Sequence, residues 1–340
     1  MKAMVLERTV SAIEEEPEVL VLKDLPIPEP GPGEVLVEVL ACGICRTELD
    51  EIEGRRKPRL PVIPGHEVVG RVVKLGPGVS RLREGDRVGV GWIYSACGKC
   101  RFCEAGEENL CEEFRGTGCD EDGGYAEYMV VREDFAFPIP SRFGDLEAAP
   151  LLCAGAIGYR ALRLTGMKDG EILGLFGFGA SAHIVYQVAR HLFPRAKIFV
   201  FTRRKGDAPS ELARQMGADW VGETGEMPPE RVKRAIDTTP SGAVVREALK
   251  VLDRGGRLVI NAIRKEGPIP ELDYADHMWL EKEIKTVANI ARRDIAEFLP
   301  LAAEIPILPE IKVFDLREAN EALLSLKRGG YRGAGVLKMR

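Results

Sequence analysis

The sequence predicts an α/β protein with a doubly wound parallel sheet and a second, β-rich domain. Its 340 residues exceed what one hydrophobic core usually serves, so two domains are expected. Short strands separated by glycine and proline turns fill the first third of the chain, and after Pro138-Ile139-Pro140 the pattern changes to alternating strands and helices. Such alternation implies a parallel sheet covered by helices on both faces.

The β-rich domain is placed at residues 1–145. Polar and apolar residues alternate from Glu34 to Leu40, and β-branched residues are frequent from Val68 to Leu75. Turns such as Pro30-Gly31-Pro32-Gly33 and Gly76-Pro77-Gly78 separate these strands. We therefore expect a domain of short strands here.

The parallel-sheet domain is placed at residues 146–288. Its predicted strands are Ile172 to Phe176, Lys197 to Thr202, Ala235 to Asp237, Arg257 to Asn261 and Ile284 to Ala288. Its predicted helices are Ala180 to Leu192, Ser210 to Met216 and Ala243 to Leu252. Residues 289–340 follow with a helix and strand-like Glu310 to Phe314 and Gly335 to Met339. Periodicity allows this segment to join either domain, and we assign it as a return to the first.

Composition excludes several classes of protein. The chain is 45% hydrophobic and 30% charged, with a net charge of -5, so it lacks the basic excess of a nucleic-acid-binding surface. No apolar run approaches the length of a membrane span. Charged Glu7 and Arg8 come too early for a signal peptide, and we expect a cytoplasmic protein.

Four of the eight cysteines form a compact motif, C-x2-C-x2-C-x7-C, within residues 95–113. They are Cys97, Cys100, Cys103 and Cys111. Four thiolates at this spacing can close a tetrahedral zinc site that holds a loop in place. An iron–sulfur cluster is the alternative, but the fourth cysteine comes too late for a ferredoxin-type motif and no proline follows it. The motif indicates a structural role.

A glycine turn after the strand ending at Phe176 predicts a dinucleotide site. Gly177, Gly179 and Ala182 match G-x-G-x-x-G/A between a strand and a helix. The first glycine makes the tight turn, the second lets the backbone approach the pyrophosphate, and Ala182 takes the packing position. The helix N-terminus then faces the phosphates.

The end of the next strand indicates which dinucleotide is bound. An acidic residue there would bind a free ribose 2'-hydroxyl, but the strand ends in Thr202, followed by Arg203-Arg204-Lys205. A hydroxyl and guanidinium groups suit a 2'-phosphate, so NADP(H) is favoured over NAD(H). The alternative is that this basic run is simply solvated and NAD(H) is used.

Three further residues have donor atoms suited to a catalytic metal. Cys45, His66 and Cys153 are each unremarkable alone, since a lone histidine or cysteine is more often structural. However, the segment from Gly65 to Val79 fits the pattern G-H-E-x2-G-x5-G-x2-V, and Gly85-Asp86-Arg87-Val88 follows. Together with the cysteine motif and the glycine turn, these residues make nearly the whole chain resemble the zinc-containing medium-chain alcohol dehydrogenases.

That resemblance implies a GroES-like catalytic domain joined to a Rossmann domain, with two zinc ions per chain. It implies that Cys45, His66 and Cys153 bind the catalytic zinc, with Glu67 an occasional fourth ligand. The cysteine motif falls where the family carries its structural zinc. Glu48 occupies the position of the family's usual aspartate, which hydrogen-bonds the ligand histidine, and a solvated surface acid is the alternative.

The resemblance also assigns roles around the reaction. It places Arg46 near the pyrophosphate and makes Thr47 the first carrier of the proton released from the substrate. Many relatives continue this relay with a histidine where the chain has Asp50, so we expect Asp50 to be an outer relay or a ribose contact. Trp92 and Ile93 are candidates for the pocket wall, with core packing an equal alternative for Trp92.

One phosphate contact of the family is missing from the sequence. Ala334 stands where an arginine is frequent, and Arg332 is a weak candidate to replace it.

The sequence thus predicts a zinc-dependent alcohol dehydrogenase or aldehyde reductase that transfers hydride between a small primary or secondary alcohol and NADP(H). A polyol, amino-alcohol or aryl-alcohol dehydrogenase using NAD(H) is the nearest alternative. A catalytically inactive nucleotide-binding zinc protein, or a zinc-free quinone reductase, fits less well because all the expected ligands are present. We expect a homotetramer by analogy.

Overall fold

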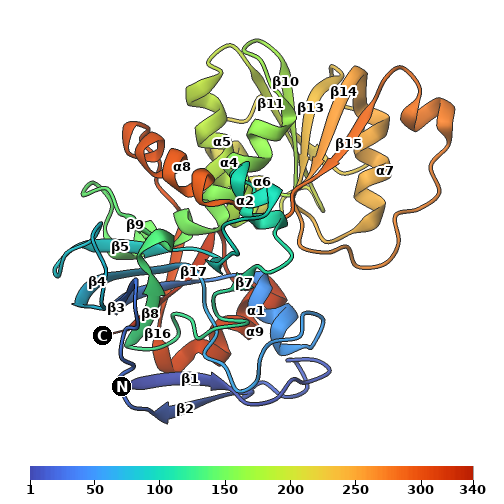
Figure 1. Cartoon of the computed structure of the whole chain (residues 1–340). Helices are drawn as coiled ribbons and strands as arrows, with labels where there is room; N and C mark the ends of the chain where they lie inside the picture. Colours follow the sequence, from blue (N-terminus) through green and yellow to red (C-terminus); the bar gives the residue numbers. More distant parts are fainter. Residues whose placement is uncertain (340) are drawn as a thin grey trace. The chain divides into compact units, whose positions relative to one another are not determined.

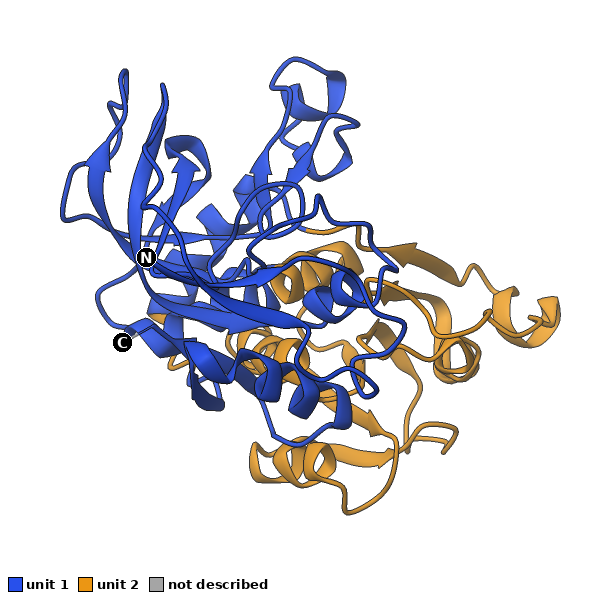
Figure 2. Ribbon diagram, turned by 90° about the horizontal axis from the view of Figure 1, so that it is seen from below, with its two compact units in different colours: residues 1–156, 290–303, 308–340 blue, residues 157–289, 304–307 orange. Residues whose placement is uncertain are grey.

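The computed structural model describes residues 1–339 and divides into two compact units. Unit 1 comprises Met1–Ala156, Ile290–Ala303 and Leu308–Arg340, and unit 2 comprises Ile157–Asn289 and Glu304–Ile307 (Figure 2).

Unit 1 is built on a seven-stranded sheet within the described part of the chain. Its strand order is β16-β17-β3-β4-β5-β9, and β8 also pairs with β3 (Figure 1). The strands are β3 (Glu34–Ile44), β4 (Val68–Leu75), β5 (Arg87–Val90), β8 (Tyr128–Arg132), β9 (Ala136–Pro138), β16 (Ile311–Asp315) and β17 (Ala334–Lys338). Alternation along β3 buries Val35, Val37 and Val39, so the longest strand supplies much of the core.

Two small sheets and several short helices complete unit 1. The small sheets pair β1 (Lys2–Leu6) with β2 (Leu20–Asp24) and β6 (Ile93–Ser95) with β7 (Arg115–Gly116). The helices are α1 (Arg46–Ile52), α2 (Arg101–Glu104), α3 (Asp145–Ala148), α8 (Arg292–Glu304) and α9 (Ala319–Arg328). Single 3₁₀ turns are η1 (Glu108–Leu110), η2 (Glu133–Phe135), η3 (Ala149–Leu152) and η5 (Leu316–Glu318). Helix α4 (Ala154–Thr165) begins in unit 1 and continues in unit 2.

Unit 2 contains a six-stranded parallel sheet, counted over residues 1–339. Its order is β12-β11-β10-β13-β14-β15. The strands are β10 (Ile172–Phe176), β11 (Lys197–Thr202), β12 (Trp220–Glu223), β13 (Val232–Asp237), β14 (Leu252–Ile260) and β15 (Glu283–Thr286). The helical segments are α5 (Ala180–Leu192), α6 (Ala208–Gln215), α7 (Gly242–Val251) and the π-helical turn η4 (Tyr274–Met278). Strand order reverses between β10 and β13, which is where doubly wound sheets bind ligands.

The predicted fold class is confirmed in both units. Strands β4 and β10 and helix α5 have the predicted bounds. The C-terminal segment, which the sequence allowed in either domain, adds β16 and β17 to the sheet of unit 1, since β17 pairs with β3. Strand β12 was not predicted. Among the described residues, no helix is both long enough and apolar enough to span a membrane.

Candidate functional site

Four possible metal ligands from distant parts of the sequence meet in unit 1. One donor atom from each of Cys45, His66, Glu67 and Cys153 lies within 4.8 Å of the others. Antiparallel pairing of β3 with β4 aligns Cys42 with Val68, which places the residues just after β3 beside those just before β4. The third segment is the junction between η3 and α4. The sheet register therefore assembles this group, which we call the dispersed site.

Glycine at position 43 makes room for the Glu67 carboxylate. A Cβ atom at Gly43 would lie 2.0 Å from Glu67 Oε2 and 2.8 Å from its Cβ, so a side chain there would displace the carboxylate. The Gly43 amide also donates to the Glu67 carbonyl at 2.9 Å. Glu67 is 2% exposed, and burial raises the pKa of its carboxyl well above the usual range.

Glu48 links two members of the dispersed site. Its Oε1 lies 2.7 Å from His66 Nδ1, and its Oε2 accepts the Cys45 amide at 2.8 Å. Glu48 is fully buried, so the alternative of a solvated surface acid is wrong. Burial raises the pKa of Glu48, and the adjacent imidazole opposes part of this effect. The longer side chain of Glu48 thus still reaches the His66 ring from the position of the family's aspartate.

The donor set of the dispersed site fits a metal ion. Because Nδ1 faces Glu48, the free ring nitrogen of His66 is Nε2, which is buried and has no hydrogen-bond partner in residues 1–339. Buried polar atoms are nearly always satisfied, and an orphaned imidazole nitrogen beside two thiols suits a metal. A hydrogen bond from Cys153 lowers the pKa of the Cys45 thiol, and the nearby His66 acts in the same direction.

Three residues of helix α1, which follows Cys45, have different environments. Thr47 is buried, with Oγ1 3.5 Å from Cys45 Sγ. Asp50 is also buried, and its Oδ1 accepts Arg55 Nε at 2.5 Å. Arg46 is exposed. Thr47 is thus beside the possible ligands, whereas the carboxylate of Asp50 is held in an ion pair.

Trp92 packs against the dispersed site and is itself buried. It is 2% exposed, and its ring meets the His66 ring edge-on with centroids 4.9 Å apart. Trp92 is thus part of the core beside His66, and a role of Trp92 or Ile93 in the wall of the substrate pocket stays a prediction.

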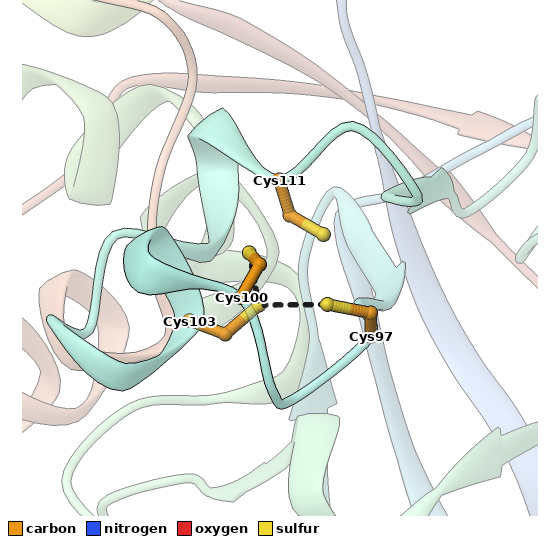
Figure 3. Close-up of side chains that lie close together, drawn as sticks. All are labelled: Cys97, Cys100, Cys103 and Cys111. Atoms are coloured by element: carbon orange, nitrogen blue, oxygen red, sulfur yellow. Dashed lines mark hydrogen bonds between the residues drawn. The ribbon is translucent and has the colours of Figure 1, made fainter.

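The four-cysteine motif forms a second group in unit 1, which we call the lobe. All four Sγ atoms, of Cys97, Cys100, Cys103 and Cys111, lie within 4.8 Å of one another and converge on one point (Figure 3). Sγ of Cys103 is 3.8 Å from that of Cys97 and 3.6 Å from that of Cys100, and all eight cysteines of the chain are free. Hydrogen bonds from the amides of Lys99 and Cys100 help to lower the pKa of Cys97 to about 7. The loop thus favours a thiolate at Cys97, whereas burial raises the pKa of Cys103 to about 12.

The glycine turn of unit 2 has the predicted conformation. Gly177 has φ 82°, and a Cβ atom there would lie 2.8 Å from Thr238 Oγ1. Gly179 is the N-cap of α5, and Ala182 is 1% exposed in its packing position. The turn therefore leaves backbone at the end of β10 free of side chains, as a pyrophosphate site needs.

The basic run after β11 divides into paired and unpaired side chains. Lys205 Nζ contacts Glu226 at 2.5 Å. Arg203 and Arg204 are exposed, and their guanidinium groups have no ion-pair or hydrogen-bond partner in the described chain. Thr202 is buried and donates from Oγ1 to the Arg204 carbonyl at 3.2 Å. In unit 1, Arg332 Nε donates to Glu310 at 2.6 Å, so the weak candidate for a phosphate contact is already engaged.

A polar network that was not predicted from the sequence lies beside the glycine turn. Asp237 ends β13 fully buried, and its carboxylate accepts the amide and hydroxyl of Thr239 at 2.8 and 2.7 Å and Nζ of Lys265 at 2.5 Å. Two threonines directly after a buried strand were the available signal. This network fixes the loop that faces Gly177.

Comparisons with known proteins agree with this architecture. Residues 31–141 match the family model for the alcohol dehydrogenase GroES-like domain. The chain is 44% identical over 317 residues to the "Probable alcohol dehydrogenase AdhA" of Mycobacterium tuberculosis (strain CDC 1551 / Oshkosh), covering 92% of this chain and 90% of the relative.

Solved structures extend the likeness over the whole chain. A cobalt- and zinc-bound thermostable alcohol dehydrogenase from Pyrobaculum aerophilum is 28% identical with a TM-score of 0.87, covering 100% of this chain and 99% of that one. CAD from Helicobacter pylori, complexed with NADP(H), is 24% identical with a TM-score of 0.88 over 100% and 99% of the two chains. Metal ions and NADP(H) are thus bound in structures that share this fold.

One conclusion follows from the two sheets, the match to the GroES-like family model and the relative at 44% identity. The chain belongs to the zinc-containing medium-chain alcohol dehydrogenase family and is an oxidoreductase of the alcohol dehydrogenase type.

Proposed function

We propose that the protein is a zinc-dependent alcohol dehydrogenase or aldehyde reductase that transfers hydride between a small primary or secondary alcohol and NADP(H). The observation that carries this proposal is the meeting of Cys45, His66 and Cys153 around the orphaned Nε2 of a histidine fixed by Glu48. A ligand set of two thiols and one imidazole is typical of a catalytic zinc with an open position.

Each residue of the dispersed site has a separate task in this proposal. Cys45, His66 and Cys153 hold the catalytic zinc, and when bound there zinc supplies Lewis-acid polarisation of the substrate oxygen. Glu48 fixes the His66 ring and its tautomer through Nδ1. Glu67, whose carboxylate lies close to the other three donor atoms, is proposed as an occasional fourth ligand of this zinc.

The lobe is proposed to hold a second, structural zinc. A tetrahedron with metal–sulfur bonds of about 2.3 Å has sulfur atoms roughly 3.8 Å apart. The separations of 3.8 and 3.6 Å within the lobe suit a single ion of this kind better than a larger iron–sulfur cluster. Four protein ligands leave no open position, so the role is structural.

Thr47 is proposed to carry the proton of the substrate hydroxyl. Its Oγ1 is buried beside Cys45 Sγ and can both accept and donate a hydrogen bond. A role for Asp50 as the outer proton relay or a ribose contact is also proposed. In the structure its carboxylate is paired with Arg55. If Asp50→Asn leaves the rate and its pH profile unchanged, the relay role is wrong.

NADP(H) is favoured because of what surrounds the end of β11. No carboxylate ends the strand, and the unpaired guanidinium groups of Arg203 and Arg204 are available for a 2'-phosphate. Gly177, Gly179 and Ala182 are proposed to hold the pyrophosphate, with Arg46 as a further contact. NADP(H) supplies or accepts the hydride.

The substrate and the state of assembly stay predictions. Polyol, amino-alcohol and aryl-alcohol oxidation with NAD(H) is the alternative within the family. Cytoplasmic location and a tetramer rest on composition and analogy.

The proposal is tested by initial rates on a panel of small aldehydes and ketones with zinc-loaded protein, comparing NADPH with NADH. We expect turnover with a clear preference for NADPH, and loss of that preference in the double variant Arg203→Ala, Arg204→Ala. The matched control is Lys205→Ala, whose charge is already paired with Glu226. Preference for NADH would overturn the cofactor assignment, and no turnover with either cofactor would overturn the function.

A further inference from the structure

A cationic side chain lies one aromatic ring away from the dispersed site. The Trp92 ring meets His66 edge-on at 4.9 Å, and Cζ of Arg56 lies 4.7 Å from the centroid of the same Trp92 ring. The Phe114 ring lies 5.7 Å from the same Cζ atom. Arg56 is thus fixed by two aromatic rings near the place where the proposed function puts the reacting oxygen.

The contacts of Arg56 leave several of its donors unused. Nε donates to Cys119 Sγ at 3.1 Å, and Nη2 lies 3.5 Å from Asp120 Oδ2. A guanidinium has five N–H groups, and Nη1 has no partner within residues 1–339. The side chain is 33% exposed, so part of it is accessible.

Neighbouring acids cancel this charge only in part. Asp120 Oδ2 already accepts the Gly116 amide at 2.7 Å, and its contact with Arg56 is long. Glu51 is 1% exposed and neither of its oxygens has a hydrogen-bond partner in the described chain, while burial raises the pKa of its carboxyl well above the usual range. Burial thus disfavours the charged form of the Glu51 carboxyl.

The other charges around this segment are mostly engaged. Arg55 pairs with Asp50 and Glu53, while Arg59 and Arg115 both contact Glu121. Lys57 is exposed and its ammonium has no partner in the described residues. The run from Arg55 to Arg59 thus has an excess of positive charge, of which Arg56 is the part ordered by aromatic rings.

We propose that Arg56 binds a carboxylate at the far end of the substrate, so that the preferred substrates are short aldehydes or alcohols carrying a carboxylate. This inference rests on the proposed function, because it deepens the substrate class of the same site. A planar guanidinium held on an aromatic face presents its edge to a carboxylate in a two-point hydrogen bond. The carboxylate also keeps the reacting carbon in a defined position.

The test compares succinic semialdehyde with its methyl ester, which removes the charge but keeps the aldehyde. Wild-type enzyme is expected to show a kcat/KM for the acid about tenfold or more above that for the ester, the size of one charge-assisted hydrogen-bonded pair. Arg56→Met should lower this acid-to-ester ratio by about tenfold, and Arg56→Lys should lower it less. Lys57→Met, a matched loss of charge in the same run, should leave the ratio unchanged.

A second variant and a second readout keep the proposal testable if Arg56→Met folds poorly. Asp120→Asn should raise the acid-to-ester ratio, because it removes the acid that competes for Arg56. Calorimetric titration with 4-hydroxybutyrate, without cofactor, should give weaker binding in Arg56→Lys than in wild type.

Equal acid-to-ester ratios in wild type and both Arg56 variants would overturn the proposal. If neither the acid nor the ester is reduced while other small aldehydes are, the proposed substrate class fails; if no aldehyde or ketone is reduced with either cofactor, the proposed function fails. Calorimetry then still decides whether Arg56 binds a carboxylate, and equal affinities in wild type and Arg56→Lys would contradict it.

Discussion

The two cysteine groups of unit 1 differ in how the chain builds them. The lobe takes all its ligands from within fifteen positions, uses only thiols and is partly exposed. The dispersed site joins residues from Cys45 to Cys153, mixes sulfur, nitrogen and carboxylate donors, and is mostly buried. Glu48 and Trp92 pack against it, so its geometry depends on tertiary structure.

This difference is what the proposed roles require, a structural metal in the lobe and a catalytic metal in the dispersed site. Four equivalent thiols on a short loop can close around an ion and leave nothing open for a substrate. In the dispersed site, buried Glu48 orients the ring of His66. Two thiols and one imidazole then leave a coordination position of the metal open. The predictions below test whether the two groups do have these separate roles.

The largest effect is expected from breaking the dispersed site. His66→Ala should lower kcat by about a thousandfold or more, because the ligand that orients the metal is lost. The circular dichroism spectrum should be retained. His191→Ala removes an exposed histidine of α5 and should leave the rate unchanged. A His66→Ala enzyme with near-normal turnover would contradict the assignment.

Breaking the lobe should affect heat stability and largely spare kcat, the opposite of what is expected for the dispersed site. The double variant Cys100→Ser, Cys103→Ser should keep its initial kcat within about threefold but lose its activity at raised temperature about tenfold faster. The reason is that the loop of residues 97–111 would lose the ion that its four cysteines are proposed to hold. Timed inactivation followed by residual-activity assays measures this. Immediate loss of turnover in freshly prepared protein would mean that the lobe takes part in the reaction.

An intermediate effect is expected at Glu48, which contacts Cys45 and His66 of the dispersed site but is not one of the proposed metal ligands. Glu48→Leu should lower metal affinity or kcat/KM by about ten- to a hundredfold, as for other partners of metal-bound histidines. Glu48→Asp, the usual family residue, should recover most of the loss. Competition with a zinc chelator measures the affinity. Normal zinc retention and activity in Glu48→Leu would show that the contact with His66 Nδ1 is dispensable.

The smallest effect concerns Glu53, the C-cap residue of helix α1. Burial acts to raise its pKa, but hydrogen bonds from the Ile13 amide, Arg55 and Lys327 outweigh burial and lower it below the usual 4.5. A lowered pKa stabilises the fold above pH 4.5, and this contribution disappears as the pH falls through the lowered value. Glu53→Gln should therefore cost about 1–2 kcal/mol of unfolding free energy at neutral pH and less in acid.

Denaturant unfolding of Glu53→Gln at several pH values measures this. The exposed acid Glu16, paired with Arg8, provides the control, and Glu16→Gln should have no measurable effect. A loss in Glu53→Gln that stays constant with pH would contradict the account.

The sequence predicted local features of the fold well and long-range ones poorly. β-Branched Val68–Leu75 and the glycine turn between β10 and α5 are local signals, and they gave the correct bounds. Strand β12 (Trp220–Glu223) has only four residues, most of them half-buried, and no alternation to reveal it. Membership of β17 in the sheet of unit 1 depends on pairing with β3, about 290 residues earlier in the chain, which periodicity cannot indicate.

The candidate sites show the same division. Spacing alone identified the lobe, because its ligands are close in sequence. The dispersed site was predicted only through the family resemblance, since its members are spread over more than a hundred positions. Nothing in the sequence indicated that Arg56 stacks on Trp92, because that contact exists only after folding.

The most direct test is the zinc content of three proteins by inductively coupled plasma mass spectrometry. The account predicts two zinc ions per chain in wild type. One is expected in Cys45→Ser, Cys153→Ser, which should be inactive but heat-stable. One is also expected in Cys100→Ser, Cys103→Ser, which should be active but heat-labile. Two zinc ions in the Cys45→Ser, Cys153→Ser protein would contradict the claim that the dispersed site holds the reactive metal.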